Sequence, residues 1–178
     1  MPSTLRSEIL HEYSKAQTMR IVNRIGDDQA AFGELVHLVL QNEEKVAQRA
    51  AWVMSHCVEQ NPALALPHIE SLVKNLHNKV HDAIKRNTAK ILENLPIPEA
   101  LIGEAVDILF RFVADPNETI AVRVFSMTAL FNLCKNEPDL LEELRLIIED
   151  MMPHGTAGLR SRGKKTLKEI EKITRKPI

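Results

Sequence analysis

The sequence predicts an all-α fold in which antiparallel helical hairpins stack in a row. Strand signals are nearly absent, because only 4% of the residues are aromatic and no stretch alternates polar and apolar residues between hairpin turns. Apolar residues recur instead at spacings of three and four, the period of an amphipathic helix. Breakers such as Asn61-Pro62 and Asp115-Pro116 interrupt these runs at regular intervals. The helices are therefore expected to be short and closely connected.

The breakers divide the chain into about nine helices. In chain order the expected spans are 3–24, 28–41, 43–60, 63–77, 79–95, 99–114, 118–136, 138–152 and 156–174. Links of only a few residues between consecutive helices favour antiparallel neighbours. A chain of 178 residues suits one domain or a short repeat array and is too short for two ordinary domains. We therefore expect a single domain over residues 1–178.

A period of 37 residues runs along the chain. Four arginines recur at this spacing, namely Arg49, Arg86, Arg123 and Arg160. One apolar column with the same spacing consists of Leu35, Leu72, Leu109 and Leu146. Further columns are Val36, Val73, Phe110 and Ile147, and Phe32, Ile69 and Val106, the last of which breaks at Glu143. We interpret each apolar column as one helix position that buries the seam between neighbouring hairpins, the pattern of a helical solenoid.

The segment DPNETIAVRVFSMTAL, at 115–130, joins an Asp-Pro pair that ends one helix to a Val-Arg pair in the next. KVAQRAAWVMSHC, HDAIKRNTAKILENL and TAGLRSRGKKTLKEI echo it, and the pattern resembles the HEAT repeat. The resemblance implies a right-handed superhelix of antiparallel hairpins, at 27–61, 63–96, 99–136 and 138–175, with an N-terminal capping helix at 3–24. The chain departs from the repeat pattern at Glu12, where the arginine column would continue, and at Asn78 and Met152, which replace Asp115.

The arginine column has two interpretations. In HEAT-like arrays such arginines typically pair with acidic groups or helix-end carbonyls of adjacent turns, so the resemblance implies that they hold one repeat against the next. A guanidinium suits this role, because its planar head donates to several carbonyls while its stem packs on apolar surface. The alternative is a row of cations that face a groove and bind phosphate or carboxylate.

The second helix of each hairpin would line the concave side of a HEAT-like array. Equivalent stripes on three of these helices hold Lys45, Arg49, Trp52 and His56; Asp82, Arg86, Ala89 and Glu93; and Thr119, Arg123, Ser126 and Leu130. Trp52 would face only the small Ala89 and Ser126, which leaves room beside it for a peptide or an anionic group, unless Trp52 simply fills the repeat interface. The candidate binding residues are Lys45, Arg49, Trp52, His56, Arg86, Glu93 and Arg123.

Motifs for catalysis or metal binding are not found. HExxH and CxxC spacings are absent, as are a nucleophile elbow and a Gly-rich phosphate loop. Cys57 and Cys134 lie in helical apolar patterns, which suits buried thiols better than a disulfide framework. We expect no catalytic residues, no metal and no cofactor, and the interpretation that the protein is not an enzyme is favoured.

The formal net charge of −1 conceals a division along the chain. Residues 1–98 are balanced, residues 99–152 carry four Lys+Arg against 11 Asp+Glu, and residues 153–178 carry eight against two. Such runs are usually solvated faces, although they also occur on binding surfaces. In the basic end, Leu159, Leu167, Ile170 and Ile173 keep helical spacing, so a solubilising cap is favoured over a nucleic-acid contact.

These patterns favour a non-catalytic protein–protein interaction or scaffold module that presents a concave helical surface to an extended or helical partner segment. Two alternatives stay open: a small nucleic-acid-binding or DNA-glycosylase-like HEAT protein, and an accessory protein similar to the HEAT-like lyases that attach bilin pigments. The N-terminus has no apolar stretch of signal-peptide length, and no window has the roughly 18 apolar residues of a membrane span. We therefore expect a cytoplasmic protein with no membrane contact.

Overall fold

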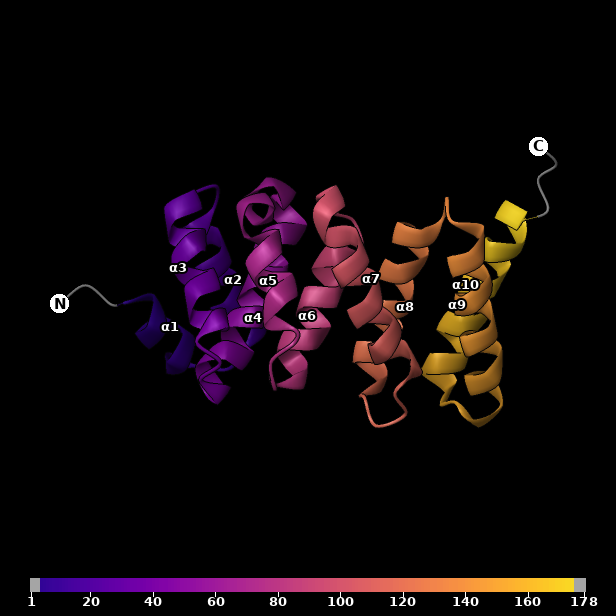
Figure 1. The fold of residues 1–178 in the computed structure, drawn as a ribbon. Helices are drawn as coiled ribbons and strands as arrows, with labels where there is room; N and C mark the ends of the chain where they lie inside the picture. The colour runs from indigo at the N-terminus through magenta and orange to yellow at the C-terminus, as the bar shows by residue number, and fades with distance from the viewer. Residues whose placement is uncertain (1–3, 175–178) are drawn as a thin grey trace. The chain divides into compact units, whose positions relative to one another are not determined.

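The computed structural model describes residues 4–174, and every regular element in this range is helical. Ten α-helices and two short 3-10 segments occur there, without a strand, so the predicted all-α fold is confirmed. The chain forms two compact units (Figure 1). The first contains Met1–Ile91 and Leu95–Ile97, and the second contains Leu92–Asn94 and Pro98–Ile178. The right-handed superhelix and the single domain over 1–178 stay predictions.

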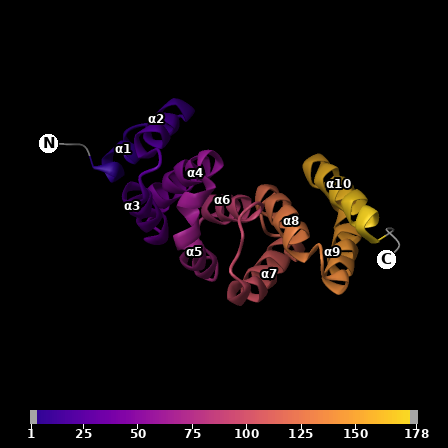
Figure 2. The ribbon, with the colours of Figure 1, turned by 90° about the horizontal axis from the view of Figure 1, so that it is seen from above.

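The first unit contains the elements up to α6. In chain order they are α1 (Leu5–His11), α2 (Lys15–Ile25), α3 (Gln29–Leu40), α4 (Glu44–Gln60), η1 (Pro62–His68), α5 (Ile69–Asn75) and α6 (Asp82–Leu92), which ends at the unit boundary. Helices α3 and α5 lie on one side of this unit, and α2, α4 and α6 lie on the other (Figure 2). Helix α4 is its central element, because it packs against α1, α2 and α3. Phe32, Val46, Ala50 and Met54 are fully buried between these helices.

The predicted helix at 3–24 is two helices in the structure. Glu12 and Ser14 both have extended backbone, and the Ser14 side chain accepts a hydrogen bond from the backbone N–H of Gln17, 3.1 Å away. This hydrogen bond satisfies one of the unpaired N–H groups at the start of α2, so Ser14 begins a new helix instead of continuing the old one. Residue 3, the expected first residue, lies outside the described residues.

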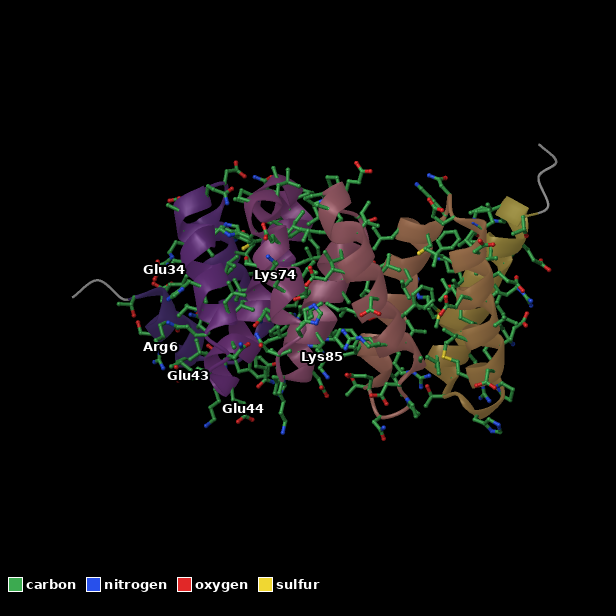
Figure 3. The ribbon with its side chains drawn as sticks, in the orientation of Figure 1. Arg6, Glu34, Glu43, Glu44, Lys74 and Lys85 are labelled. Carbon is green, nitrogen blue, oxygen red and sulfur yellow. The ribbon has the colours of Figure 1, made fainter. Side chains whose placement is uncertain are left out.

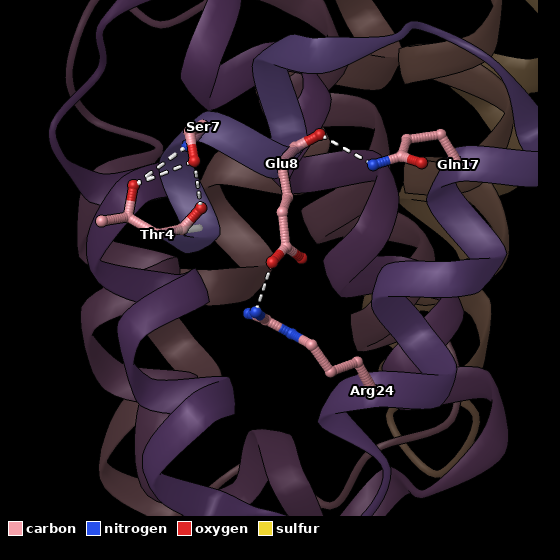
Figure 4. A network of polar contacts seen from close by, with 5 residues as sticks. All are labelled: Thr4, Ser7, Glu8, Gln17 and Arg24. Atoms are coloured by element: carbon pink, nitrogen blue, oxygen red, sulfur yellow. Dashed lines mark hydrogen bonds and ion pairs between the residues drawn. The ribbon is translucent and has the colours of Figure 1, made fainter. Parts of the chain in front are cut away.

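Three successive carbonyls at the end of α1 accept hydrogen bonds from side chains of other helices. Gln17 of α2 donates to the Glu8 carbonyl at 3.0 Å, and Arg49 of α4 donates to the carbonyls of Ile9 and Leu10 at 3.2 and 3.1 Å. The Glu8 carboxylate in turn pairs with Arg24 (Figure 4). A helix of seven residues is too short to persist alone in water, so these contacts hold α1 in place.

Ion pairs on the surface also join α1 to α4. Arg6 of α1 forms a salt bridge with Glu43, the residue just before α4, and Figure 3 shows the two side chains together. Both side chains are about half exposed, and pairs of this kind contribute little to stability. The carbonyl contacts of Arg49 and Gln17 are therefore the more important link between α1 and the rest of the unit.

The predicted helix at 63–77 begins as the 3-10 segment η1 and becomes α-helical only at Ile69. Pro67 lies inside η1 and lacks a backbone N–H, so it cannot make the regular hydrogen bond of an α-helix. Asn61 caps this segment with its side-chain oxygen, 3.2 Å from the backbone nitrogen of Ala63.

The second unit contains four longer helices. They are α7 (Glu99–Ala114), α8 (Ile120–Cys134), α9 (Pro138–Met151) and α10 (Ala157–Thr174), with η2 (Met152–His154) between the last two. Helices α7 and α9 lie on one side of this unit, and α8 and α10 lie on the other (Figure 2). Helix α8 packs against α7, α9 and α10, and its Met127 and Leu130 are fully buried. Residue 175, the expected end of the last hairpin, lies outside the described residues.

Helix α9 departs from the predicted 37-residue register. The prediction that every member of the leucine column is buried is therefore wrong at one position. Leu35, Leu72 and Leu109 are at most 1% exposed, whereas Leu146 is 53% exposed. The buried residues of α9 are instead Leu141, Leu144 and Ile148. They follow the buried Ala105, Ile108 and Phe112 of α7 by 36 residues, so α9 is shifted by one position. This shift turns Leu146 about 100° around the helix, away from the core.

Candidate functional site

Four of the predicted binding residues lie on α4, in the first unit. Lys45 is exposed, and Arg49, Trp52 and His56 are partly buried. The indole of Trp52 and the imidazole of His56 have centroids 5.9 Å apart, one helical turn from each other. With the residues that contact them, these four side chains form a surface that we name the α4 strip: Lys45, Arg49, Trp52, His56 and Glu59 of α4, with Tyr13 and Lys90 against it.

Tyr13 contributes the most exposed aromatic ring of the α4 strip. Its ring lies edge-on to Trp52, with centroids 5.5 Å apart and an interplanar angle of 69°, and the Arg49 guanidinium carbon is 5.1 Å from its centroid. Aromatic pairs prefer this T-shaped geometry, and the cation adds attraction to the ring face. Tyr13 remains 53% exposed. It is not among the predicted residues, although it is the only tyrosine and lies at a helix boundary.

Arg49, a member of the arginine column, links two helices. Its Nη1 group is within hydrogen-bonding distance of the carbonyl oxygens of Ile9 and Leu10, in the last turn of α1. The last carbonyls of a helix have no partner within the helix, and a cation is favourable there. Arg49 thus joins α1 to α4 and at the same time supports the ring of Tyr13.

A polar chain continues the α4 strip toward α6. His56 Nδ1 lies 2.7 Å from Glu59 Oε2, and Lys90 of α6 forms an ion pair with the other oxygen of Glu59. Although partial burial opposes it, the hydrogen bonds from Lys90 and His56 and the charge of Lys90 lower the pKa of Glu59 below its usual value. Glu59 and Lys90 are not among the predicted residues. Glu59 could have been found from its i+3 spacing to His56.

Trp52 contacts two other rings. The centroids of the Tyr13 and His56 rings lie 5.5 and 5.9 Å from that of Trp52. Ala89 and Ser126, the small residues predicted to face Trp52, are both 0% exposed. The open space beside Trp52 stays a prediction.

Arg86 makes no hydrogen bond, ion pair or ring contact with the residues of the α4 strip within residues 4–174. Arg86 lies partly buried on α6, and its guanidinium has no hydrogen-bond partner in that range. Glu93 follows the end of α6 and belongs to the second unit, where its backbone carbonyl accepts a hydrogen bond of 2.7 Å from the Asn132 side chain.

Arg123 is the second arginine of the column that acts as a structural link. Its Nε donates to the carbonyl of Val113, in the last turn of α7, at 3.0 Å, and its Nη2 lies 3.1 Å from the sulfur of Met151 in α9. Burial lowers the pKa of Arg123 from its usual value, and the charge of Asp115 opposes this shift. Arg160, the last member, is exposed and makes no such contact among the described residues. Arg49 and Arg123 thus both donate to carbonyls in the last turn of another helix, and a structural role for the whole column stays a prediction.

Arg123 also lines a surface cleft of about 530 Å³ in the second unit. The cleft lies where the connection after α7 meets the connection between α9 and α10. Its lining residues are Ala114, Pro116, Glu118, Ile120, Arg123, Asp150, Met151, His154, Gly155, Thr156 and Leu159. Of the seven predicted binding residues, four therefore lie on the α4 strip and Arg123 lines this cleft, whereas Arg86 and Glu93 are not among the residues of either.

Neither cysteine has the properties of a nucleophile or a metal ligand. Burial raises the pKa of Cys57 to about 12, and burial together with the charges of Glu137 and Glu143 raises the pKa of Cys134 to about 11. Within residues 4–174, no three His, Cys, Asp or Glu side chains converge in a way that could hold a metal ion. In the same range, no helix is both long and apolar enough to cross a membrane.

Comparison with models of protein families finds a match. A family model described as HEAT repeat domain matches residues 5–170, nearly the whole chain. Neither the curated proteins nor the solved structures contain a match to this chain.

Proposed function

Since this chain belongs to the HEAT repeat domain family, whose helical repeats typically mediate protein interactions, we propose that it is a non-catalytic module that binds a peptide segment of another protein on the α4 strip. The mechanism is presentation of a preformed surface, since the residues of the strip are held by a long helix packed on three others. Binding requires no chemical step, and no nucleophile or proton donor is assigned to it.

The exposure of Tyr13 beside Trp52 and Arg49 carries this proposal. Tryptophan, tyrosine and arginine are the residues that most often dominate the energy of protein interfaces. Tyr13 is half exposed, yet Trp52 at its edge and Arg49 at its face restrict its ring. Because the ring is already restrained before a partner arrives, little additional side-chain entropy is lost on binding.

The charges of the strip favour a peptide over a nucleic acid. Lys45, Arg49 and Lys90 are basic, but Glu59 lies among them and pairs with Lys90. Arg49 directs its Nη1 donor to backbone carbonyls of α1, which leaves it poorly placed to bind a phosphate. A nucleic-acid surface needs several free cations along one face. Mixed charges around aromatic edges suit a segment that has both apolar and polar side chains.

The experiment is selection from a random peptide library displayed on phage, followed by affinity measurements on the selected peptides. Fluorescence polarisation should show affinity lower by about tenfold or more for Trp52→Ala and for Tyr13→Ala. Tyr13→Ala is the safer variant, because an exposed ring contributes less to folding. Glu34→Ala, on an exposed position of α3 in the same unit, is the matched control and should bind as the unmodified protein does.

Two results would contradict the proposal. One is selected peptides that bind both aromatic variants with unchanged affinity while circular dichroism shows native helix content. The other is tight binding of random DNA at low salt that is lost in Trp52→Ala, which would favour the nucleic-acid alternative.

A further inference from the structure

The cleft beside Arg123 has an apolar lining that is open to solvent. Five of its residues are apolar: Ala114, Pro116, Ile120, Met151 and Leu159. Ile120, the first residue of α8, is 43% exposed, although the position lies next to a well-packed core. A large aliphatic side chain in contact with water at the mouth of a cleft is a favourable site for burial by a partner.

The rim of the cleft is acidic. Glu118 and Asp150 line it, and the Asp150 carboxylate forms no ion pair or hydrogen bond with any residue in 4–174. Asp150 also continues a line of exposed acids on α9 that includes Asp139 and Glu143, at helical spacings of four and seven residues. Residues 99–152, which contribute Glu118 and Asp150 to the cleft, carry 11 acidic side chains against four basic ones, whereas residues 153–178, which contribute His154 and Leu159, carry two against eight.

Arg123 does not make the cleft a receptor for anions. Its Nε and Nη2 are directed to the Val113 carbonyl and the Met151 sulfur, inside the unit. The charge of Asp115 acts on the same guanidinium. An incoming phosphate or carboxylate would therefore meet an engaged guanidinium and the Asp150 carboxylate, and like-charge contact opposes such binding.

We propose that this cleft is a second interaction surface, separate from the α4 strip, for a basic peptide segment of a partner protein. The segment inserts one large apolar side chain against Ile120, Met151 and Leu159, and a neighbouring lysine or arginine pairs with Asp150. Charge complementarity selects this occupant, because an apolar pocket alone accepts any hydrophobic side chain, whereas the acidic rim rejects segments of negative charge.

The probe is a fluorescent synthetic peptide made of leucine and lysine, and two control peptides are compared with it. In the first control every lysine is replaced by glutamate, and in the second every leucine is replaced by glycine. We expect the leucine–lysine peptide to bind and both control peptides to bind at least about tenfold more weakly, because the first lacks the charge and the second lacks the apolar side chain. The affinity should fall as salt is added, since the rim is exposed.

Variants locate the binding on the protein. Asp150→Lys should lower the affinity for the leucine–lysine peptide by about tenfold, and Ile120→Ser should lower it by a similar factor. Both positions are exposed, so circular dichroism should show unchanged folding. Glu34→Lys makes the same change of charge on an exposed helical position of the first unit and should leave the affinity unchanged. Trp52→Ala should also have no effect, which separates this surface from the α4 strip.

Three outcomes would overturn the proposal. The first is no binding of the leucine–lysine peptide to the unmodified protein at millimolar concentration. The second is equal weakening by Asp150→Lys and Glu34→Lys, which would indicate a general charge effect. The third is self-association of the protein that Asp150→Lys abolishes, which would make a second copy of the chain the occupant of the cleft.

Discussion

Arg49 in the first unit and Arg123 in the second occupy equivalent positions two periods apart, and they reach different partners. Arg123 donates to the carbonyl of Val113, 10 residues earlier, in the first helix of its own hairpin. Arg49 donates to the carbonyls of Ile9 and Leu10, 40 and 39 residues earlier, in helix α1, which lies outside the hairpin of Arg49. Both repeat positions thus place a guanidinium at the end of a helix. The helix that packs against each arginine determines which carbonyls accept its hydrogen bonds.

The largest expected effect concerns the two cysteines, one in each unit. Because its pKa is raised to about 12, Cys57 should hold about a thousandfold less thiolate at neutral pH than a thiol with the usual value of 9.0. For Cys134, with a pKa of about 11, the factor is about a hundred. Reaction with a thiol reagent should therefore be very slow at both cysteines in the native protein, since both are also buried. Mass spectrometry of the labelled peptides measures the rates, and rapid labelling of either cysteine in the native protein would contradict this prediction.

The same shifts predict a loss of stability in alkali. A thiol whose pKa is higher in the folded than in the unfolded protein favours folding below the unfolded value, about 9, and this contribution is lost as the pH rises toward the folded value. Chemical denaturation between pH 8 and about 11 should show a falling free energy of unfolding. The fall should be smaller in Cys57→Ala than in the unmodified protein.

Substitution of Arg49 should have the largest effect on stability among the four arginines. Arg49→Ala removes a cation from two partly buried carbonyls and from the Tyr13 ring, so we expect a loss of about 2 kcal/mol. Urea denaturation measures the loss, and Arg86→Ala is its matched control, with an expected change below about 0.5 kcal/mol. Equal losses in the two variants would show that the carbonyl contacts do not matter.

Arg123→Ala should lower the free energy of unfolding by about 1.5 kcal/mol, less than Arg49→Ala. Only one carbonyl loses its donor, and the Met151 sulfur is a weak acceptor. Helix content by circular dichroism should stay near native, because the contact joins helices and does not form one. If stability is unchanged while peptide binding at the cleft is lost, Arg123 is a binding residue and its structural role is wrong.

Gly103→Ala should stabilise the second unit by about 1 kcal/mol, the smallest effect of the series. Gly103 lies inside α7, and a Cβ added there meets no atom within 4 Å, so alanine brings only its better helix propensity. Gly163→Ala, in α10, is the contrasting control, because its Cβ would lie 3.0 Å from the Met152 sulfur and 3.1 Å from a carbon of Ile148. The gain should be smaller there or reversed. Thermal denaturation of both variants decides the comparison.

The sequence predicts the helices well because they depend on local patterns. Arg49 and Arg123 follow from a period and from the chemistry of helix ends. The break at Ser14 is harder to predict, since Leu5 and Ile9 before it and Ile21 and Ile25 after it keep the same helical spacing of four residues. The one-residue shift of α9 is hidden for a similar reason, because Leu146 continues the leucine column although the helix turns it outward. Register depends on how helices pack, which spacing alone does not reveal.

The residues of the candidate site that lie on α4 could be predicted from the sequence, whereas those that reach it from other elements could not. Lys45, Arg49, Trp52 and His56 share one helix, so helical spacing groups them. Tyr13 reaches the strip from the connection between α1 and α2, and that proximity results from tertiary packing. The cleft in the second unit is lined by residues of α7, α8, α9 and α10 and of the two connections between them, and among these residues only Arg123 is marked by the repeat.

Helix α1 is linked to the α4 strip, because its last carbonyls accept hydrogen bonds from Arg49, a residue of the strip. Arg49 holds the last carbonyls of α1 and the ring of Tyr13 with the same guanidinium, so opening of α1 and loosening of Tyr13 are one event. A partner that fixes Tyr13 must then slow that opening by thermodynamic linkage. Backbone amides of α1 should exchange with deuterium more slowly when the strip is occupied, although the partner touches none of them. The N-terminal helix thereby serves as a built-in reporter of binding.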